Sequence, residues 1–161
     1  MLDHAADHGK EGFVQCLAGS GHLLGHFFAV GIGFDEFLQA TQLAWAWVQA
    51  GDAVLVDVRS DAERAWGGFV PGAQGLAWKQ WPGMAMNPGF DAGIQALGAG
   101  GRKLVLLCRS GVRSIAAAQR ATELGLQAYN ILEGFEGDPD ANAQRGKLGG
   151  WRMRGLPWQQ N

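Results

Sequence analysis

The sequence contains little cysteine, and no histidine follows His26. Its two cysteines, Cys16 and Cys108, lie far apart and belong to no Cys-x-x-Cys pair or Cys/His ligand spacing. This pattern indicates neither a disulfide framework nor a zinc site, so we expect no metal in the protein. The part of the chain after His26 also offers no histidine as a general base.

Charge is also sparse. Asp, Glu, Lys and Arg make up 17% of the 161 residues, and the formal net charge of -2 gives no reason to expect a nucleic-acid partner. No internal repeat, heptad or block of charge is visible, so nothing indicates a solenoid or a coiled coil. The length suits one domain with a core of its own.

Charged residues are missing altogether from residues 12–34. That length is enough to cross a bilayer, but the stretch contains six glycines and two histidines, and only Lys10 supplies a positive flank. We therefore interpret residues 1–33 as an N-terminal extension of uncertain order and residues 34–161 as the folded domain. A membrane or export segment is the less favoured alternative, and we expect a cytoplasmic protein.

The domain begins with a segment of mixed pattern. Residues 34–39 fit either a short edge strand or the first turn of a helix, because their apolar residues match neither period. Thr41 is a candidate N-cap for a helix over residues 42–50. Later in the chain, short strands are predicted at residues 76–78 and 127–131.

An apolar run over residues 53–56 predicts a buried parallel strand, and the strand ends in Asp57 and Arg59. Buried charges persist only when they are paired, so each of these two side chains should have an identifiable partner. Ser60 and Glu63 form a capping-box pattern, which predicts a short helix directly after the strand.

The most informative stretch lies between another apolar run, residues 104–107, and an alanine-rich segment of high helix propensity. It is therefore a loop at the carboxyl end of a strand, where open α/β sheets bind ligands. The unpaired N–H groups and positive end of the following helix favour the thiolate of a cysteine placed there. The loop has the sequence Cys108-Arg109-Ser110-Gly111-Val112-Arg113, followed by Ser114.

Four motifs together resemble the rhodanese, or sulfurtransferase, family. The loop resembles the family's active-site loop, and Asp57-x-Arg59 resembles a pair at the end of its second strand. The other two motifs are the turns Gly68-Phe69-Val70-Pro71-Gly72-Ala73 and Leu132-Glu133-Gly134-Phe135. Phe69 departs from the family, which has a histidine there. The resemblance covers roughly residues 34–158 and implies an α/β fold with a five-stranded, mostly parallel sheet between helices on both faces.

The resemblance also implies a function. Cys108 would attack a small anionic sulfur donor such as thiosulfate and carry its sulfur as a covalent persulfide, without any other cofactor. Cyanide, or a thiol such as glutathione or a thioredoxin-like protein, would then collect the sulfur. Asp57 and Arg59 would support the loop structurally.

The loop residues each suit this chemistry. Several backbone N–H groups are expected to surround the sulfur, and Gly111 permits the unusual dihedral angles that such a cradle needs. Arg109 and Arg113 would attract the donor and stabilise the departing sulfite. Hydroxyl hydrogen bonds are expected from Ser110 and Ser114, although Ser114 fits equally well as a helix cap.

Two other hypotheses stay open at this point. The first is a phosphatase or arsenate reductase of the same fold, whose corresponding loop has the spacing Cys-x5-Arg. In this sequence Arg113 gives the spacing Cys-x4-Arg, which disfavours both enzymes. A module that carries a persulfide without turnover, or that docks a partner, would have the same sequence features as an enzyme.

The tail is rich in glycine and tryptophan and too poor in periodic apolar residues to predict regular structure. We expect Trp151 and Trp158 to cover the sheet. The alternative is that one of them lies near the cysteine loop.

Overall fold

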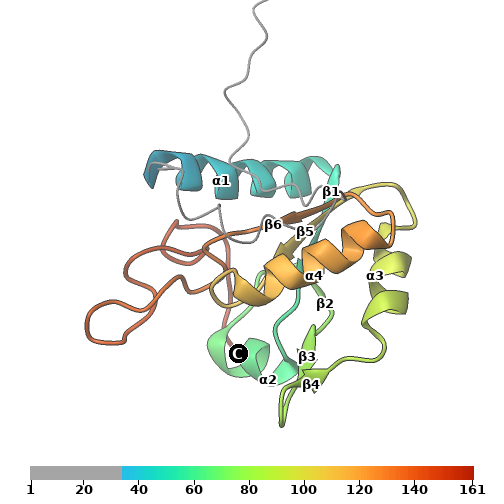
Figure 1. The fold of residues 1–161 in the computed structure, drawn as a ribbon. Helices are drawn as coiled ribbons and strands as arrows, with labels where there is room; N and C mark the ends of the chain where they lie inside the picture. Colours follow the sequence, from blue (N-terminus) through green and yellow to red (C-terminus); the bar gives the residue numbers. More distant parts are fainter. Residues whose placement is uncertain (1–33) are drawn as a thin grey trace, which may run out of the picture.

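The computed structural model describes residues 34–161, and its centre is a parallel sheet of strand order β2-β1-β5-β6 (Figure 1). Strand β1 (Ala53–Asp57) pairs with β5 (Lys103–Leu107) along their full length. Strand β2 (Gln74–Gly75) extends the sheet beside β1, and β6 (Ala128–Asn130) extends it beside β5. β1 and almost all of β5 are buried, as expected of apolar strands covered on both faces.

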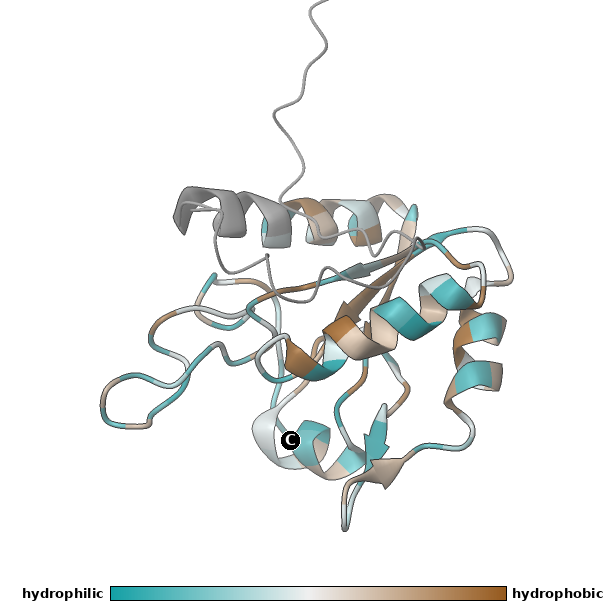
Figure 2. Cartoon of the chain, viewed as in Figure 1, coloured by the Kyte–Doolittle hydropathy of each residue, from teal (hydrophilic) through white to brown (hydrophobic). Residues whose placement is uncertain are grey.

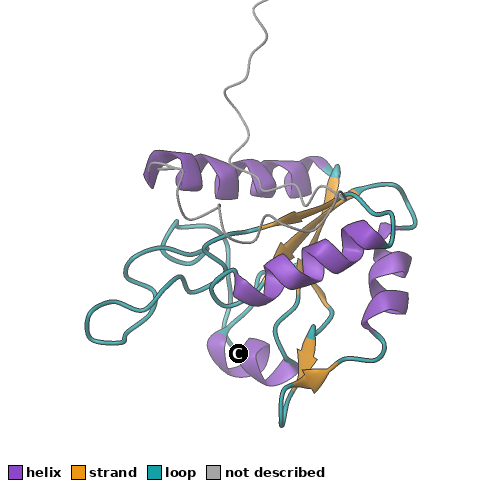
Figure 3. Ribbon diagram, viewed as in Figure 1, coloured by secondary structure: helices purple, strands orange, loops and turns teal. Residues whose placement is uncertain are grey.

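Helices cover both faces of this sheet (Figure 3). α1 (Phe34–Ala50) lies on one face, and α3 (Phe90–Gly98) and α4 (Val112–Glu123) lie on the other. Alternate residues of β1 and β5 point into the two resulting cores, and the hydropathy colouring shows their apolar character (Figure 2). The predicted α/β class, with a parallel sheet between two helical layers, is confirmed.

Two further elements follow the carboxyl end of β1. α2 (Asp61–Gly67) is closed at its start by the predicted capping box, in which Ser60 and Glu63 bond reciprocally. Strands β3 (Lys79–Gln80) and β4 (Ala85–Met86) form an antiparallel hairpin beside α2 (Figure 1).

Some boundaries differ from the predictions. Within residues 34–161 the sheet has four strands rather than five, because residues 34–39 form the first turns of α1. Thr41 therefore lies inside that helix and is not its N-cap. The good helix formers on both sides of Thr41 continue the helix through it, despite its preference for a cap position. Residues 76–78 are not a regular strand, although the Leu76 N–H still donates to the carbonyl of Asp57, the last residue of β1, and the Trp78 N–H donates to the Val58 carbonyl.

The tail after β6 contains no helix or multi-residue strand in the described chain, as predicted. Trp151 is fully buried in the core on the α1 side and meets Trp45 edge-on at 5.5 Å. Trp158 meets the Phe135 ring edge-on at 6.1 Å. The expectation that Trp151 covers the sheet is thus confirmed.

The predictions for residues 1–33 lie outside the described residues. Among the helices of residues 34–161, none has the length and apolarity to span a membrane.

Candidate active site

Cys108 directly follows β5 and is 1% exposed. Its Sγ accepts a hydrogen bond from the Gly111 N–H at 3.1 Å and one from the Ser114 hydroxyl at 3.0 Å. The same hydroxyl lies 3.0 Å from the Gly111 carbonyl oxygen, and its single proton serves one acceptor at a time. A negative sulfur is the stronger acceptor, so ionisation of Cys108 directs the hydroxyl to Sγ.

The backbone at Gly111 takes the conformation that the sequence predicted. Gly111 stands at the N-cap of α4 with φ of +91°, where no side chain caps the helix. A Cβ there would lie 1.9 Å from the Leu132 carbonyl oxygen, so only glycine fits. Of the several N–H groups expected to bond to the sulfur, the Gly111 N–H is the one that does so within the described residues.

The turn after β6 holds the cysteine loop from outside. The Phe135 N–H donates to the Cys108 carbonyl at 2.7 Å, and the Glu136 N–H donates to the Arg109 carbonyl at 2.9 Å. Gly134 lies so close to the loop that a Cβ would meet three of its backbone atoms at 2.6 Å. The turn therefore fixes the backbone of the cysteine loop. From the sequence, this turn was identified only as a motif that resembles the family.

Asp57 and Arg59 are both buried, and both have the partners that were predicted. The Asp57 carboxylate accepts from the Arg59 backbone N–H and from its guanidinium, at distances of 2.6 to 3.2 Å. Arg59 also donates to the Gly68 carbonyl at 2.8 Å and lies 4.0 Å above the Phe135 ring. The pair thus supports Phe135, whose N–H binds Cys108.

The two arginines of the loop lie in different surroundings. Arg113 donates from both Nη atoms to the Glu63 carboxylate, at 2.8 and 2.6 Å. Arg109 is exposed, and its guanidinium makes no ion pair or hydrogen bond within residues 34–161. Both arginines were expected to attract the donor. Of the two, Arg113 is neutralised by Glu63, and Arg109 has no charged partner in the described chain.

The Glu63–Arg113 contact shifts the pKa values of both side chains. Burial opposes the ionisation of Glu63, but hydrogen bonds from Arg113 and Ser60 outweigh it and lower the pKa of Glu63 from 4.5 to about 2. The hydrogen bond to Glu63 raises the pKa of Arg113 above its usual value, and the charges of Cys108 and Asp57 add to this. The pair is ionised throughout the neutral range.

A cleft of about 490 Å³ opens beside the loop. Its walls come from three segments, namely α2, the turn between β3 and β4, and the loop itself. The lining residues are Ser60, Ala62, Glu63, Trp66, Trp81, Met84, Arg109 and Arg113. Sequence reasoning identified the arginines, but it gave Glu63 only a capping role and missed Trp66, Trp81 and Met84, which no motif marks.

The departure at Phe69 has a structural counterpart in the tail. Phe69 exchanges two backbone hydrogen bonds with Gln159, each of 2.8 Å, in an antiparallel bridge. The turn that has a histidine in the family is here held by the C-terminal segment.

In this site a cysteine lies at the carboxyl end of a parallel strand, and its sulfur faces the start of a helix. The fold and the site together define an α/β protein whose candidate active-site loop surrounds a cysteine thiol. A family model of the rhodanese-like domain matches residues 40–138. The chain belongs to this rhodanese-like family.

Three known proteins are similar to this chain. The crystal structure of Rv0390 from M. tuberculosis is 39% identical, with a TM-score of 0.66 over 75% of this chain and 95% of that one. The human single-domain sulfurtransferase TSTD1 is 26% identical over 58% of this chain and 87% of its own, with a TM-score of 0.45. The uncharacterized protein RC0915 of Rickettsia conorii is 44% identical over 57 residues, which are 35% of this chain and 41% of that protein. The chain thus matches less than half the length of this curated relative.

Proposed function

We propose that the protein is a sulfurtransferase that passes a sulfane sulfur through a persulfide on Cys108. The observation that carries the proposal is the pair of donors at Sγ, the Gly111 N–H at 3.1 Å and the Ser114 hydroxyl at 3.0 Å. Both donors stabilise a sulfur anion, which is the nucleophile that sulfur transfer needs. Membership of the rhodanese-like family supports the same function.

In the first half-reaction, the Cys108 thiolate attacks the outer sulfur of thiosulfate. The bond between the two donor sulfurs breaks, sulfite leaves with the electron pair, and Cys108 becomes a persulfide anion. Arg109, with its unneutralised charge, attracts the donor and stabilises the departing sulfite. No proton moves, so this step needs no general base.

In the second half-reaction, an acceptor attacks the terminal sulfur of the persulfide. As the new bond forms, the bond between the terminal sulfur and Cys108 Sγ breaks and its electron pair stays on Sγ. Cyanide is thereby converted to thiocyanate, and a thiolate such as glutathione or a thioredoxin-like protein is converted to a persulfide. The Cys108 thiolate is restored. The covalent persulfide is the only carrier in this scheme, which uses no metal or other cofactor.

The setting of Arg113 weighs against phosphatase or arsenate chemistry. An oxyanion-binding loop uses the paired N–H groups of its arginine to bind oxygens of the anion. In this chain the Arg113 guanidinium is bonded to both oxygens of Glu63.

The proposal is tested with thiosulfate and cyanide as substrates and thiocyanate as the measured product. Wild type should turn over, and Cys108→Ala should fall to background. Intact-mass spectrometry after incubation with thiosulfate should find a gain of about 32 Da, one sulfur, that depends on Cys108. Turnover that survives Cys108→Ala would overturn the mechanism. The adduct without turnover would favour a persulfide carrier instead.

A further inference from the structure

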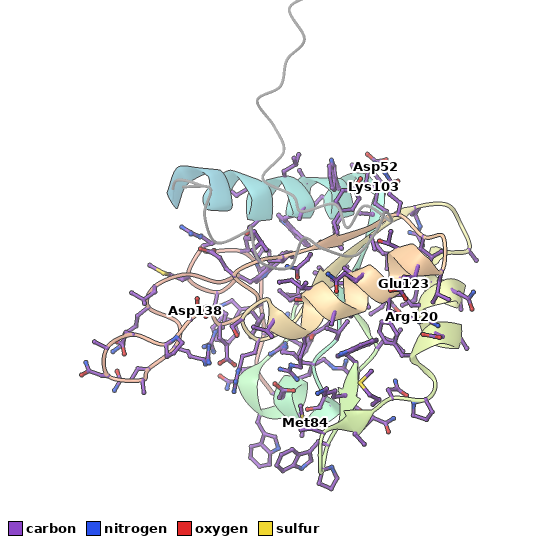
Figure 4. All side chains as sticks on the ribbon, viewed as in Figure 1. Asp52, Met84, Lys103, Arg120, Glu123 and Asp138 are labelled. Atoms are coloured by element: carbon purple, nitrogen blue, oxygen red, sulfur yellow. The ribbon has the colours of Figure 1, made fainter. Side chains whose placement is uncertain are left out.

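Two tryptophans in the wall of the cleft are strongly exposed. Trp66 on α2 is 82% exposed, and Trp81 in the β3–β4 hairpin is 66% exposed. Met84 completes this apolar wall from the hairpin turn (Figure 4). Side chains of this size are usually buried, and a group of them that shares a cleft with Arg109 and Arg113 of the cysteine loop marks a binding surface.

The cleft is larger and more apolar than an inorganic donor requires. Its volume of about 490 Å³ lies in the range of small-molecule sites, about 300–1,000 Å³. Thiosulfate is a five-atom ion without an apolar part, so it has nothing to place against the tryptophans. Charge in the cleft is also limited, because Glu63 neutralises Arg113 and leaves Arg109 as the unneutralised cation of the described wall.

We propose that the cleft binds organic sulfane-sulfur donors, with an aromatic or aliphatic body against Trp66 and Trp81 and an anionic head beside Arg109. Aromatic rings stack on tryptophan faces and bury apolar area there. The cleft thus suits one elongated small molecule with an apolar end and a single negative charge at the other end. This inference rests on the proposed sulfur transfer by Cys108.

The transfer step is the same as with thiosulfate. With an aryl thiosulfonate, the Cys108 thiolate attacks the terminal sulfur, and the bond between that sulfur and the sulfonyl sulfur breaks. The aryl sulfinate leaves with the electron pair, and Cys108 becomes a persulfide anion. The charge balances, because the thiolate and the thiosulfonate each carry one negative charge, as do the persulfide and the sulfinate. Trp66 and Trp81 act as specificity-determining residues, since they contact the body of the donor and not its reacting sulfur.

The test compares benzenethiosulfonate with methanethiosulfonate, which have the same head and charge and differ only in the body. For each donor, kcat/KM with cyanide is divided by the rate with a free thiol in solution. Wild type should prefer the benzene compound by about tenfold, the order that one apolar group contributes in a hydrophobic site. Trp66→Ala and Trp81→Ala should each reduce this preference several-fold, and Trp66→Phe should retain most of it. Leu148→Ala removes an exposed apolar side chain outside the cleft and should leave the ratio unchanged.

The outcomes separate the two proposals. Equal corrected rates for both donors in wild type, or a preference that neither Trp66→Ala nor Trp81→Ala reduces, would overturn the aromatic donor site. Turnover of thiosulfate would still support the proposed function in that case. If none of the three donors gives Cys108-dependent thiocyanate, sulfur transfer itself is wrong.

Discussion

The Glu63 carboxylate and the Arg113 guanidinium are joined by two hydrogen bonds, of 2.8 and 2.6 Å, across 50 residues of sequence. One partner belongs to the capping box that starts α2, and the other lies in the first turn of α4. The contact ties the cysteine loop to the α2 wall of the cleft. It also removes the charge of Arg113 from the site, so that the two loop arginines have different tasks.

We expect Glu63→Gln to lower the free energy of unfolding by about 1–3 kcal/mol at neutral pH, because it leaves the partly buried Arg113 without its charged partner. Glutamine retains the volume of the side chain and an oxygen for the Ser60 N–H. Urea denaturation measures the change. Asp61→Asn is the matched control, since Asp61 pairs with Arg64 in the same helix but is 91% exposed, and its loss should cost less than about 1 kcal/mol. Equal losses in the two variants would contradict the prediction.

The stability difference between wild type and Glu63→Gln should also depend on pH. The folded-state pKa of Glu63, about 2, lies below its ordinary 4.5, so acid protonates the unfolded chain first. The contribution, about 1–3 kcal/mol once solvent screening of this part-exposed pair is allowed for, is complete above pH 4.5 and is lost as the pH falls toward 2. Unfolding curves at several pH values measure it. A difference that stays constant down to about pH 3 would show that Glu63 acts without its charge.

Arg109→Ala and Arg113→Ala should have separate kinetic effects. Arg109 is unneutralised and exposed, so its loss should raise the thiosulfate KM about tenfold with a smaller effect on kcat. Arg113 positions the loop through Glu63, so its loss should lower kcat and stability more than it raises KM. Steady-state thiocyanate formation over a range of thiosulfate concentrations gives both constants. An unchanged KM in Arg109→Ala would reject its role in donor binding.

The position of the nucleophile was predictable from sequence because it depends on local pattern. An apolar strand, a glycine and a helix-forming segment are contiguous around Cys108, and their order alone places the thiol at a helix start. The partners of Asp57 and Arg59 were likewise predictable in kind, since a buried charge requires compensation.

The walls of the site were not predictable in this way. Glu63 meets Arg113 only because α2 and α4 come together in three dimensions, and a capping box contains no sign of a distant partner. An exposed Trp66 and a buried Trp151 look alike in sequence, and only the packing of the tail against α1 distinguishes them. The strand number was misjudged because short edge segments contain too few residues to show a period.

Ser114→Ala should make Cys108 less reactive. The substitution removes one of the two hydrogen-bond donors at Sγ within the described chain, so the thiolate loses about 1 kcal/mol of stabilisation or somewhat more. Alkylation by iodoacetamide at neutral pH should slow about three- to tenfold. Thr122→Ala is the control, because its hydroxyl donates to the Ala118 carbonyl on the same helix and not to the cysteine. An unchanged alkylation rate in Ser114→Ala would assign that hydroxyl to its other acceptor, the Gly111 carbonyl.

Gly134→Ala should displace the backbone of the cysteine loop, although Gly134 is not part of that loop. Gly134 has φ of +65°, and an added Cβ would meet backbone atoms of Cys108, Arg109 and Ser110 at 2.6 Å. Gly125 has φ of +83° with nothing within 4 Å of such a Cβ, so Gly125→Ala isolates the cost of the backbone conformation, about 1–2 kcal/mol. We expect Gly134→Ala to cost about 1–3 kcal/mol more than this control in urea denaturation, because the loop and turn must separate. Sulfur transfer should fall strongly in Gly134→Ala and stay near wild type in Gly125→Ala. Similar activity in the two variants would mean that the turn does not hold the loop in its working geometry.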